Sequence, residues 1–338
     1  MTNKKLILVS IPLVFLIISI GTSIGSSNIN IFHTMSILGH KILGLPLIKG
    51  VDPNNISIIW SLRLPRVLLA FLVGGSLAAS GAVVQSVLKN QLASPYTLGV
   101  SAGASLGAGL IIVLGVSIPV LGGFTLPLVG FIFGVITVFL VVIFSRKIDK
   151  GMSNNTIILT GMVFSLFVNA ILTTISALFS DQIKSITLWQ MGSFAMKGWS
   201  SVVAIIPFFV VGIIGIMCFT KEMDVLTFGE EQAKAVGVEI GRVKGILFIM
   251  SAVLTGSAVA LSGTIGFVDL IAPHVVRRIV GSRHKIVIPM SIVFGGCLMV
   301  LTDLISRIIL PNSELPVGAI TAIFGAPFFA YIYFKKGR

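Results

Sequence analysis

Long apolar runs, separated by short polar connections, occupy almost the whole chain. Nine of them contain no charged residue, and each is close to the about 20 residues that an α-helix needs to cross a bilayer. They lie at 6–24, 67–88, 97–115, 123–144, 155–178, 200–219, 245–262, 286–302 and 317–334. Because the runs are continuously apolar and lack the alternation of a membrane barrel strand, they favour helices.

A tenth segment, 264–280, is apolar but interrupted by Asp269, Pro273, His274 and Arg277. Polar and helix-breaking residues are tolerated at membrane depth where they are buried in protein. We therefore expect a short or broken helix packed among the others. The pattern as a whole predicts an all-α polytopic membrane protein of about ten transmembrane helices, forming a single domain over residues 1–338.

Composition excludes a soluble globular protein. Of the 338 residues, 55% are hydrophobic and 10% are charged, against about 25% charged in an ordinary soluble domain, and the mean hydropathy is +1.08. The net charge of +13 is typical of basic cytoplasmic loops. With a cytoplasmic N-terminus, 17 of the 24 Lys and Arg residues fall inside and 7 outside, and an even number of spans places the C-terminus inside as well.

The first apolar run has a second interpretation. Lys4 and Lys5 before it, and small residues between Gly21 and Ser27 after it, are also typical of a secretory signal peptide. A retained first span accounts better for the charges of the remaining loops.

Signatures of enzyme chemistry are missing from the sequence. It contains no GxxxxGK[ST] phosphate-binding loop, no cluster with metal-ligand spacing and no nucleophile elbow. Cys218 and Cys297 both lie inside apolar runs, so neither a metal site nor a structural disulfide is expected. We expect transport or channel function, without enzyme activity or a cofactor in this chain.

Two connections are long. The first, 25–63, is expected outside and contains an amphipathic stretch around 31–43. The second, 220–243, is expected inside and is the charge-dense stretch KEMDVLTFGEEQAKAVGVEIGRVK. It is either a partner-binding surface or a solvated loop helix.

Local signals within 220–243 predict a short helix near 228–236. Thr227 followed by Glu230 matches a capping box, Glu231 adds charge at the positive helix end, and Gly237 suits the position after the helix. Ala233 and Ala235 are small enough to let a partner approach closely.

Arginines mark the expected outer surface. Arg63 and Arg66 lie at the mouth of the second span, and Arg307 lies four residues after Asp303, where an ion pair on one helix face is available. They either extend to the membrane interface or form a basic ring that captures an acidic partner.

Three polar residues lie inside the predicted spans. Asp269 is either a proton relay or a carboxylate paired with Arg277 or with another helix. His274 is expected to be structural, and Gln85 either lines a path or bridges two helices.

Three blocks of sequence resemble the FecCD-type permeases in matching order. They are WSLRLPRVLLAFLVGGSLAASGAVVQSVLKNQLASPYTLGVSAGASLGA at 60–108, GTIGFVDLIAPHVVRRIVGSRHK at 263–285 and DLISRIILPNSELPVGAITAIFGAPFF at 303–329. The family comprises membrane subunits of bacterial ABC importers for ferric siderophores, haem and cobalamin. The resemblance implies the type II importer fold, a place in the bacterial cytoplasmic membrane, a second identical or related permease, two cytoplasmic ATPases that bind ATP, and an extracytoplasmic substrate-binding protein.

The resemblance also implies roles for individual positions. The segment 220–243 matches the region that docks on the ATPase, and Arg63, Arg66 and Arg307 match arginines that pair with glutamates of the binding protein. Residues matching the transport path or its inner gate are Gln85, Asn90, Pro95 and Gly99. The chain departs from the family pattern at Asp269, where a small residue is usual, and at Gln91, where proline is common.

Substrate specificity resides mainly in the binding protein, which is another chain. Because ferric siderophores are the most frequent substrates of such permeases, we expect a ferric siderophore, with haem and cobalamin as alternatives. An ion-coupled secondary transporter would need ionisable residues near the midplane, for which Asp269 is the candidate. A scaffold or receptor subunit would leave the arginines and the 220–243 segment unexplained.

Overall fold

The computed structural model describes residues 3–25, 29–48, 50–310 and 313–335, and these residues form helices and no strand. Six helical segments are long and apolar enough to cross a membrane, and three shorter apolar helices and α13 accompany them. The elements are α1 (Asn3–Ser23), α2 (Ile31–Leu43), α3 (Pro53–Ser57), a π-helical turn (Ile58–Arg63), α4 (Leu64–Val87), α5 (Val100–Leu114), α6 (Thr125–Ile148), α7 (Asn154–Leu178), α8 (Ile183–Gln190), α9 (Trp199–Met217), α10 (Thr220–Phe228), α11 (Glu230–Ala235), α12 (Ile240–Ser262), α13 (Val268–Val280), α14 (His284–Ile308) and α15 (Val317–Lys335). The expectation of an all-helical membrane bundle is confirmed.

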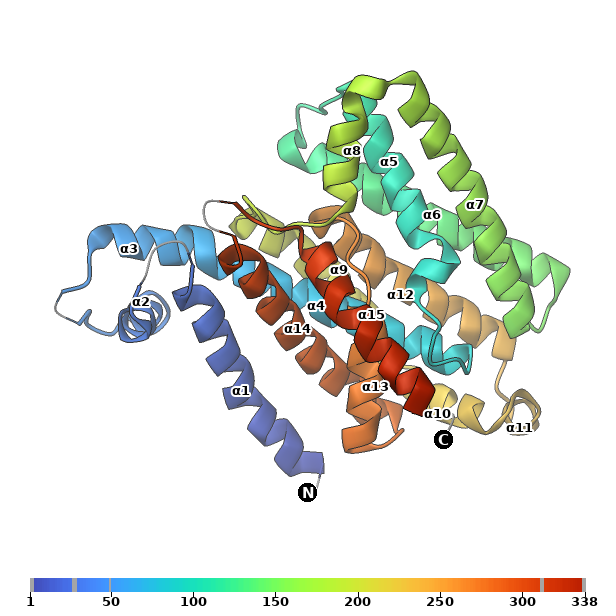
Figure 1. The fold of residues 1–338 in the computed structure, drawn as a ribbon. Coiled ribbons are helices and arrows are strands. Elements are labelled where there is room, and N and C mark those ends of the chain that lie inside the picture. The colour runs from blue at the N-terminus through green and yellow to red at the C-terminus, as the bar shows by residue number, and fades with distance from the viewer. Residues whose placement is uncertain (1–2, 26–28, 49, 311–312, 336–338) are drawn as a thin grey trace.

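Helix α4 is the centre of the bundle, and α14, α12, α13 and α9 pack around it (Figure 1). Small residues bring two of these neighbours very close. A methyl group built on Gly74 would lie 2.3 Å from the carbonyl oxygen of Gly295 on α14, and one on Gly81 would lie 2.0 Å from the carbonyl oxygen of Asp269 on α13. Glycine is therefore required at both positions for the helices to touch at backbone distance.

The same kind of contact joins α5 to α6. A methyl group on Gly103 would lie 2.6 Å from the carbonyl oxygen of Phe133, and one on Gly107 would lie 2.8 Å from that of Val129. In contrast, the helices α6, α7 and α9 leave much of their apolar surface exposed within the chain. Such surface is stable against lipid, which agrees with a multi-pass membrane protein.

The second span begins earlier than the sequence pattern predicts. Instead of starting at 67, helical structure is continuous from Pro53 to Val87. A π-helical turn leads directly into α4, and Pro65 occupies the first turn of α4, where its missing N–H is tolerated. The connection 25–63 is therefore largely helical, and its amphipathic stretch is α2, capped by the Asn30 side chain.

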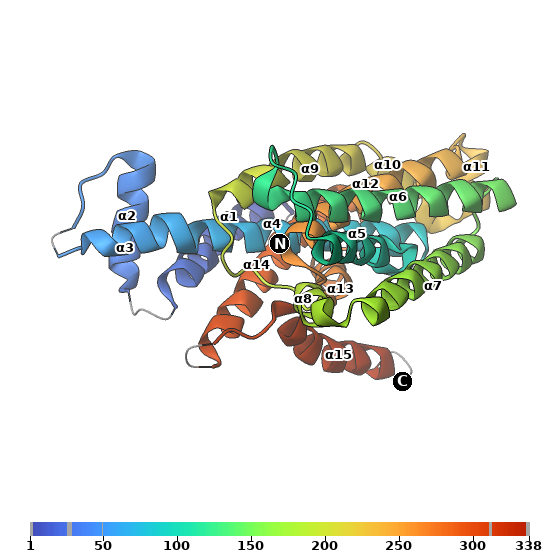
Figure 2. The ribbon, with the colours of Figure 1, turned by 90° about the horizontal axis from the view of Figure 1, so that it is seen from above.

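The bundle is elongated and has two distinct ends (Figure 2). We call the end with α2, α3 and the start of α4 the Arg66 end, and the opposite end the α11 end. Helix α1 finishes at the Arg66 end, where Arg307 donates to Gly21 O, and α15 starts there, because Glu314 just before it binds Arg66. The first turn of α1 and the last turn of α15 therefore lie away from the Arg66 end.

Candidate functional site

The segment α10–α11 lies at the α11 end and is broken at Gly229. This glycine has a φ of 140°, which residues with side chains rarely adopt. The predicted capping box is wrong: Thr227 lies in the last turn of α10, where its hydroxyl donates to Asp224 O at 2.6 Å, and Gly229 precedes α11. Glu230 instead forms an ion pair with Lys244 at 2.8 Å.

The predicted end of the short helix is confirmed. Gly237 has a φ of 86°, and its N–H donates to Lys234 O, while the N–H of Val238 donates to Ala233 O. This pair of hydrogen bonds is the Schellman arrangement, which ends a helix at a residue in the left-handed region.

The two alanines of α11 face opposite ways. Ala233 is buried against the chain, whereas Ala235 is exposed, as are Glu231, Phe228 and Val236. Large apolar side chains on an otherwise charged segment are typical of a surface that another protein covers. The structure thus leaves Ala235, rather than Ala233, open to a partner.

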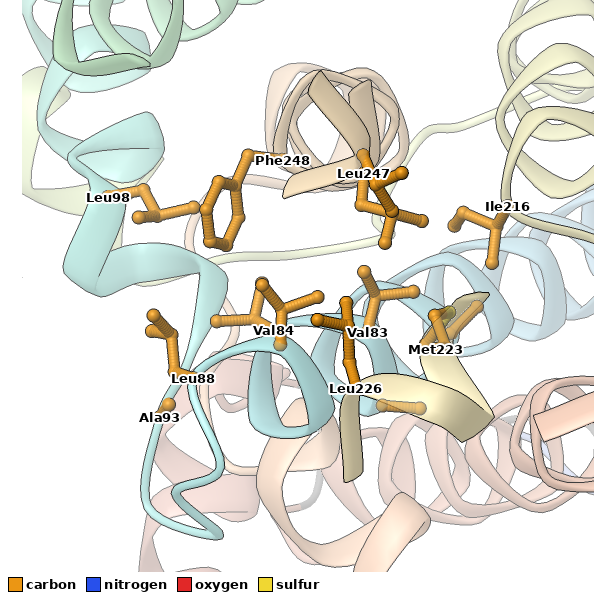
Figure 3. Packing of buried hydrophobic residues seen from close by; sticks show 14 of the residues in the cluster. Val83, Val84, Leu88, Ala93, Leu98, Ile216, Met223, Leu226, Leu247 and Phe248 are labelled. Carbon is orange, nitrogen blue, oxygen red and sulfur yellow. The ribbon is translucent and has the colours of Figure 1, made fainter. Parts of the chain in front are cut away.

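Helix α10 rests on the hydrophobic core (Figure 3). Its Met223 and Leu226 are buried in the same cluster as Val83 of α4 and Leu247 of α12. This packing fixes α10 against two long helices. Helix α11 has a single buried residue, Ala233, so apolar packing holds it much less firmly.

At the Arg66 end, two arginines share one buried carboxylate. Arg66 donates to both oxygens of Asp303, at 3.0 and 3.2 Å from its Nε, and Nη1 also binds Glu314 at 2.7 Å. Arg307 Nε lies 3.1 Å from the second oxygen of Asp303, which confirms the pair expected from their spacing. Charge-assisted bonds of this kind are strong and directional.

The third expected arginine lies beside this cluster. Arg63 donates to Ser23 O at 2.6 Å, and it lines with Arg66, Arg307, Lys197 and Glu314 a hollow of about 880 Å³. Burial lowers the pKa of Lys197, and the Arg66 guanidinium lowers the pKa of Glu314. Four cations against Asp303 and Glu314 leave the cluster with an excess of positive charge.

The turn after α4 connects it to α5. Asn90 accepts from the N–H of Leu92 at 2.9 Å, Pro95 opens a 3₁₀ turn, and Gly99, with a φ of 85°, separates this turn from α5. Gln85 is buried and bridges two helices. Its amide donates to Asp269 O and accepts from Arg277 at 2.6 Å, as the bridging interpretation predicts.

Asp269 does not pair with Arg277, which corrects one interpretation. Its carboxylate accepts from the Ser94 hydroxyl in the turn after α4, whereas Arg277 binds Gln85 and Ala82 O. The reason is helical geometry: eight residues separate Asp269 from Arg277 on α13, about 12 Å along the axis. His274 is buried on the same helix.

One polar hollow is not predicted by the sequence pattern. Its volume is about 320 Å³, and its lining is uncharged. The residues are Tyr96, Ser101, Ala102, Ser105, Ser165, Asn169, Gln190 and Thr264. A signal existed in Ser101 and Ser105, which lie one turn apart on α5, but single hydroxyls inside apolar runs are common and were not distinctive.

A bundle of apolar helices with a polar surface at either end is typical of a multi-pass membrane protein. The sequence model of the FecCD transport family matches residues 11–335. The chain is 44% identical to YvrB of Bacillus subtilis, an uncharacterised ABC transporter permease protein, over 96% of this chain and 92% of that protein. It is 36% identical to the cobalamin import system permease protein BtuC of Halobacterium salinarum, over 85% and 76% of the two chains.

A solved structure agrees over the full length. A metal-chelate type ABC transporter in an inward-facing conformation superposes with a TM-score of 0.85 at 30% identity, covering 98% of this chain and 99% of that one. The chain belongs to the FecCD transport family and is an ABC importer permease.

Proposed function

We propose that this permease moves a ferric siderophore into the bacterial cytoplasm, using ATP hydrolysed by separate subunits. The similarity to a metal-chelate transporter over essentially the whole chain is the observation that carries this proposal. Cobalamin is the second candidate substrate, favoured by the similarity to BtuC, and haem is the third within the same family.

In this proposal the α11 end faces the cytoplasm and binds the ATPase. The exposed Phe228, Ala235 and Val236 supply apolar contact area, and Glu231 supplies a charged rim. Both chain termini then lie in the cytoplasm, as the distribution of Lys and Arg predicts.

The Arg66 end faces outward and receives the substrate-binding protein. The positive excess around Arg63, Arg66 and Arg307 suits acidic side chains of that partner and would steer its approach. A second permease, identical or related, completes the transport path.

The path runs along the uncharged hollow and the turn after α4. Neutral hydroxyl and amide groups lining the hollow solvate a polar cargo without holding it tightly, which permits release. Asn90, Pro95 and Gly99 lie in or next to the turn that closes the path, and Gln85 holds α4 to α13 beside it.

The test is accumulation of radioactive iron from a panel of ferric siderophores, in cells that lack this protein and in cells with it restored. We expect loss and rescue of uptake for one siderophore, and collapse of uptake when cellular ATP is depleted. Normal uptake across the panel would refute the favoured substrate, and the same strains would then be tested with labelled cobalamin and haem. If an uncoupler abolishes uptake while cellular ATP is held constant, ATP coupling is refuted.

A further inference from the structure

We infer that two polar connections tie the segment α10–α11 to the last turn of α4 and carry movement of the ATPase to the turn at 88–99. This inference rests on the proposed function, because it assumes that the ATPase binds this segment. Apart from Glu230, it assigns positioning roles to side chains that no sequence motif singles out.

The first connection starts at Glu230 on α11. Its carboxylate accepts from Lys244 Nζ at 2.8 Å, and this ammonium, which is fully buried, also donates to Met152 O at 2.8 Å and to Asn154 Oδ1 at 3.1 Å. All three donors of the lysine are therefore used. Asn154 extends the connection to the end of α4, because its Nδ2 donates to Leu88 O at 2.9 Å.

The second connection starts at Asp224 on α10. Its carboxylate accepts from both the backbone N–H and the Nδ1 of His284, the first residue of α14. Because a carboxylate can only accept, Nδ1 carries the proton, and the other ring nitrogen, Nε2, is hydrogen-bonded to the Ser86 hydroxyl. Ser86 lies in the last turn of α4, two residues before Leu88.

The two connections converge. They begin six residues apart in the segment that we propose to bind the ATPase, and they end at Ser86 and Leu88, where α4 passes into the turn. The first connection matters most for α11, since its one buried side chain, Ala233, gives it little other attachment. At its other end, the turn is bound to α13 through Ser94 and Asp269. Displacement of the end of α4 would therefore change the backbone conformation of the turn.

The experiment uses the permease in complex with its ATPase in lipid nanodiscs. The test variant combines Asp224→Asn with Glu230→Gln, which keeps size and removes the charge at the start of both connections. Controls outside the segment 220–243 are Asp181→Asn, an exposed carboxylate before α8, and Lys147→Gln at the exposed end of α6. The measurement is hydrogen exchange of residues 88–99 with and without a non-hydrolysable ATP analogue, scaled to the amount of ATPase bound in the same sample.

We expect the nucleotide to change exchange in this turn equally in the wild type and in both controls. In the test variant the response should be at least about fivefold smaller, the lower end of usual coupling between sites. An unchanged response with ATPase bound would overturn the inference. If the double variant fails to assemble, each single variant is measured, and two unchanged responses overturn it equally. A wild-type permease that binds no ATPase would instead refute the proposed function.

Discussion

The two ends of the bundle use buried charge differently. At the Arg66 end, guanidinium and carboxylate groups bind one another directly beside a large open hollow, and positive charge remains in excess. At the α11 end, the fully buried ammonium of Lys244 is satisfied by a carboxylate, an amide oxygen and a carbonyl oxygen. The first arrangement suits a partner that binds and leaves through charge, and the second suits a partner that stays attached and whose movement must be transmitted.

The largest expected effect is at Asp303, the carboxylate shared by two arginines. Asp303→Asn leaves buried positive charge without its partner, which typically costs about 3–5 kcal/mol of folding free energy. The measurement is the melting temperature of the purified permease, with Glu314→Gln as the control, because Glu314 is 40% exposed and water can replace its role. Equal losses in the two variants would contradict a special role for the shared carboxylate.

A smaller loss is expected at the other end for Lys244→Met. It removes a buried charge and leaves Met152 O and Asn154 Oδ1 without a donor, at a cost of about 1–3 kcal/mol, since the partly exposed Glu230 regains water. The same melting experiment measures it. A loss exceeding that of Asp303→Asn would reverse the ranking of the two ends.

The next largest difference between the two ends is expected in how salt changes the affinity for each partner. Screening weakens exposed charge pairs, so raising ionic strength should lower the affinity for the binding protein by about tenfold, or about 1.4 kcal/mol, and change ATPase affinity much less. Binding of each partner to immobilised permease at low and high salt measures this. Equal salt dependence would mean that charge does not distinguish the two surfaces.

The smallest expected effect is the pH dependence contributed by Glu314. Because Arg66 lowers its pKa in the folded protein, Glu314 stabilises the fold fully above its unfolded pKa and loses this contribution as the pH falls through the lowered value. The melting difference between wild type and Glu314→Gln should therefore shrink on acidification. A difference that grows at acid pH would contradict the assigned cause.

Local signals in the sequence were sufficient for most of the fold. The apolar runs correspond to helices, Gly237 ends α11 as predicted, and the spacing of Asp303 and Arg307 anticipated their ion pair. Each of these features depends on residues within one turn or one run of the chain.

Several misses depend on residues far apart in sequence. Ser94 binds Asp269 across 175 positions, and Lys244 reaches Met152 O across 92. The periodicity of apolar residues along the sequence does not indicate which distant residues form such pairs. Thr227 does not cap α11, because the helix starts after Gly229 and not after Thr227. The unusual φ of Gly229 could not be predicted, since a glycine in a loop can adopt many backbone conformations.

The contact between Gly74 and Gly295 limits how the transporter can move. Sliding of packed helices requires side chains that can change rotamer as they pass, but here a carbonyl oxygen of one helix occupies the space where the other would carry a side chain. We therefore expect α4 and α14 to tilt together rather than slide past each other. Bending is then left to the joints at the ends of α4, the π-helical turn before it and the short turn after it.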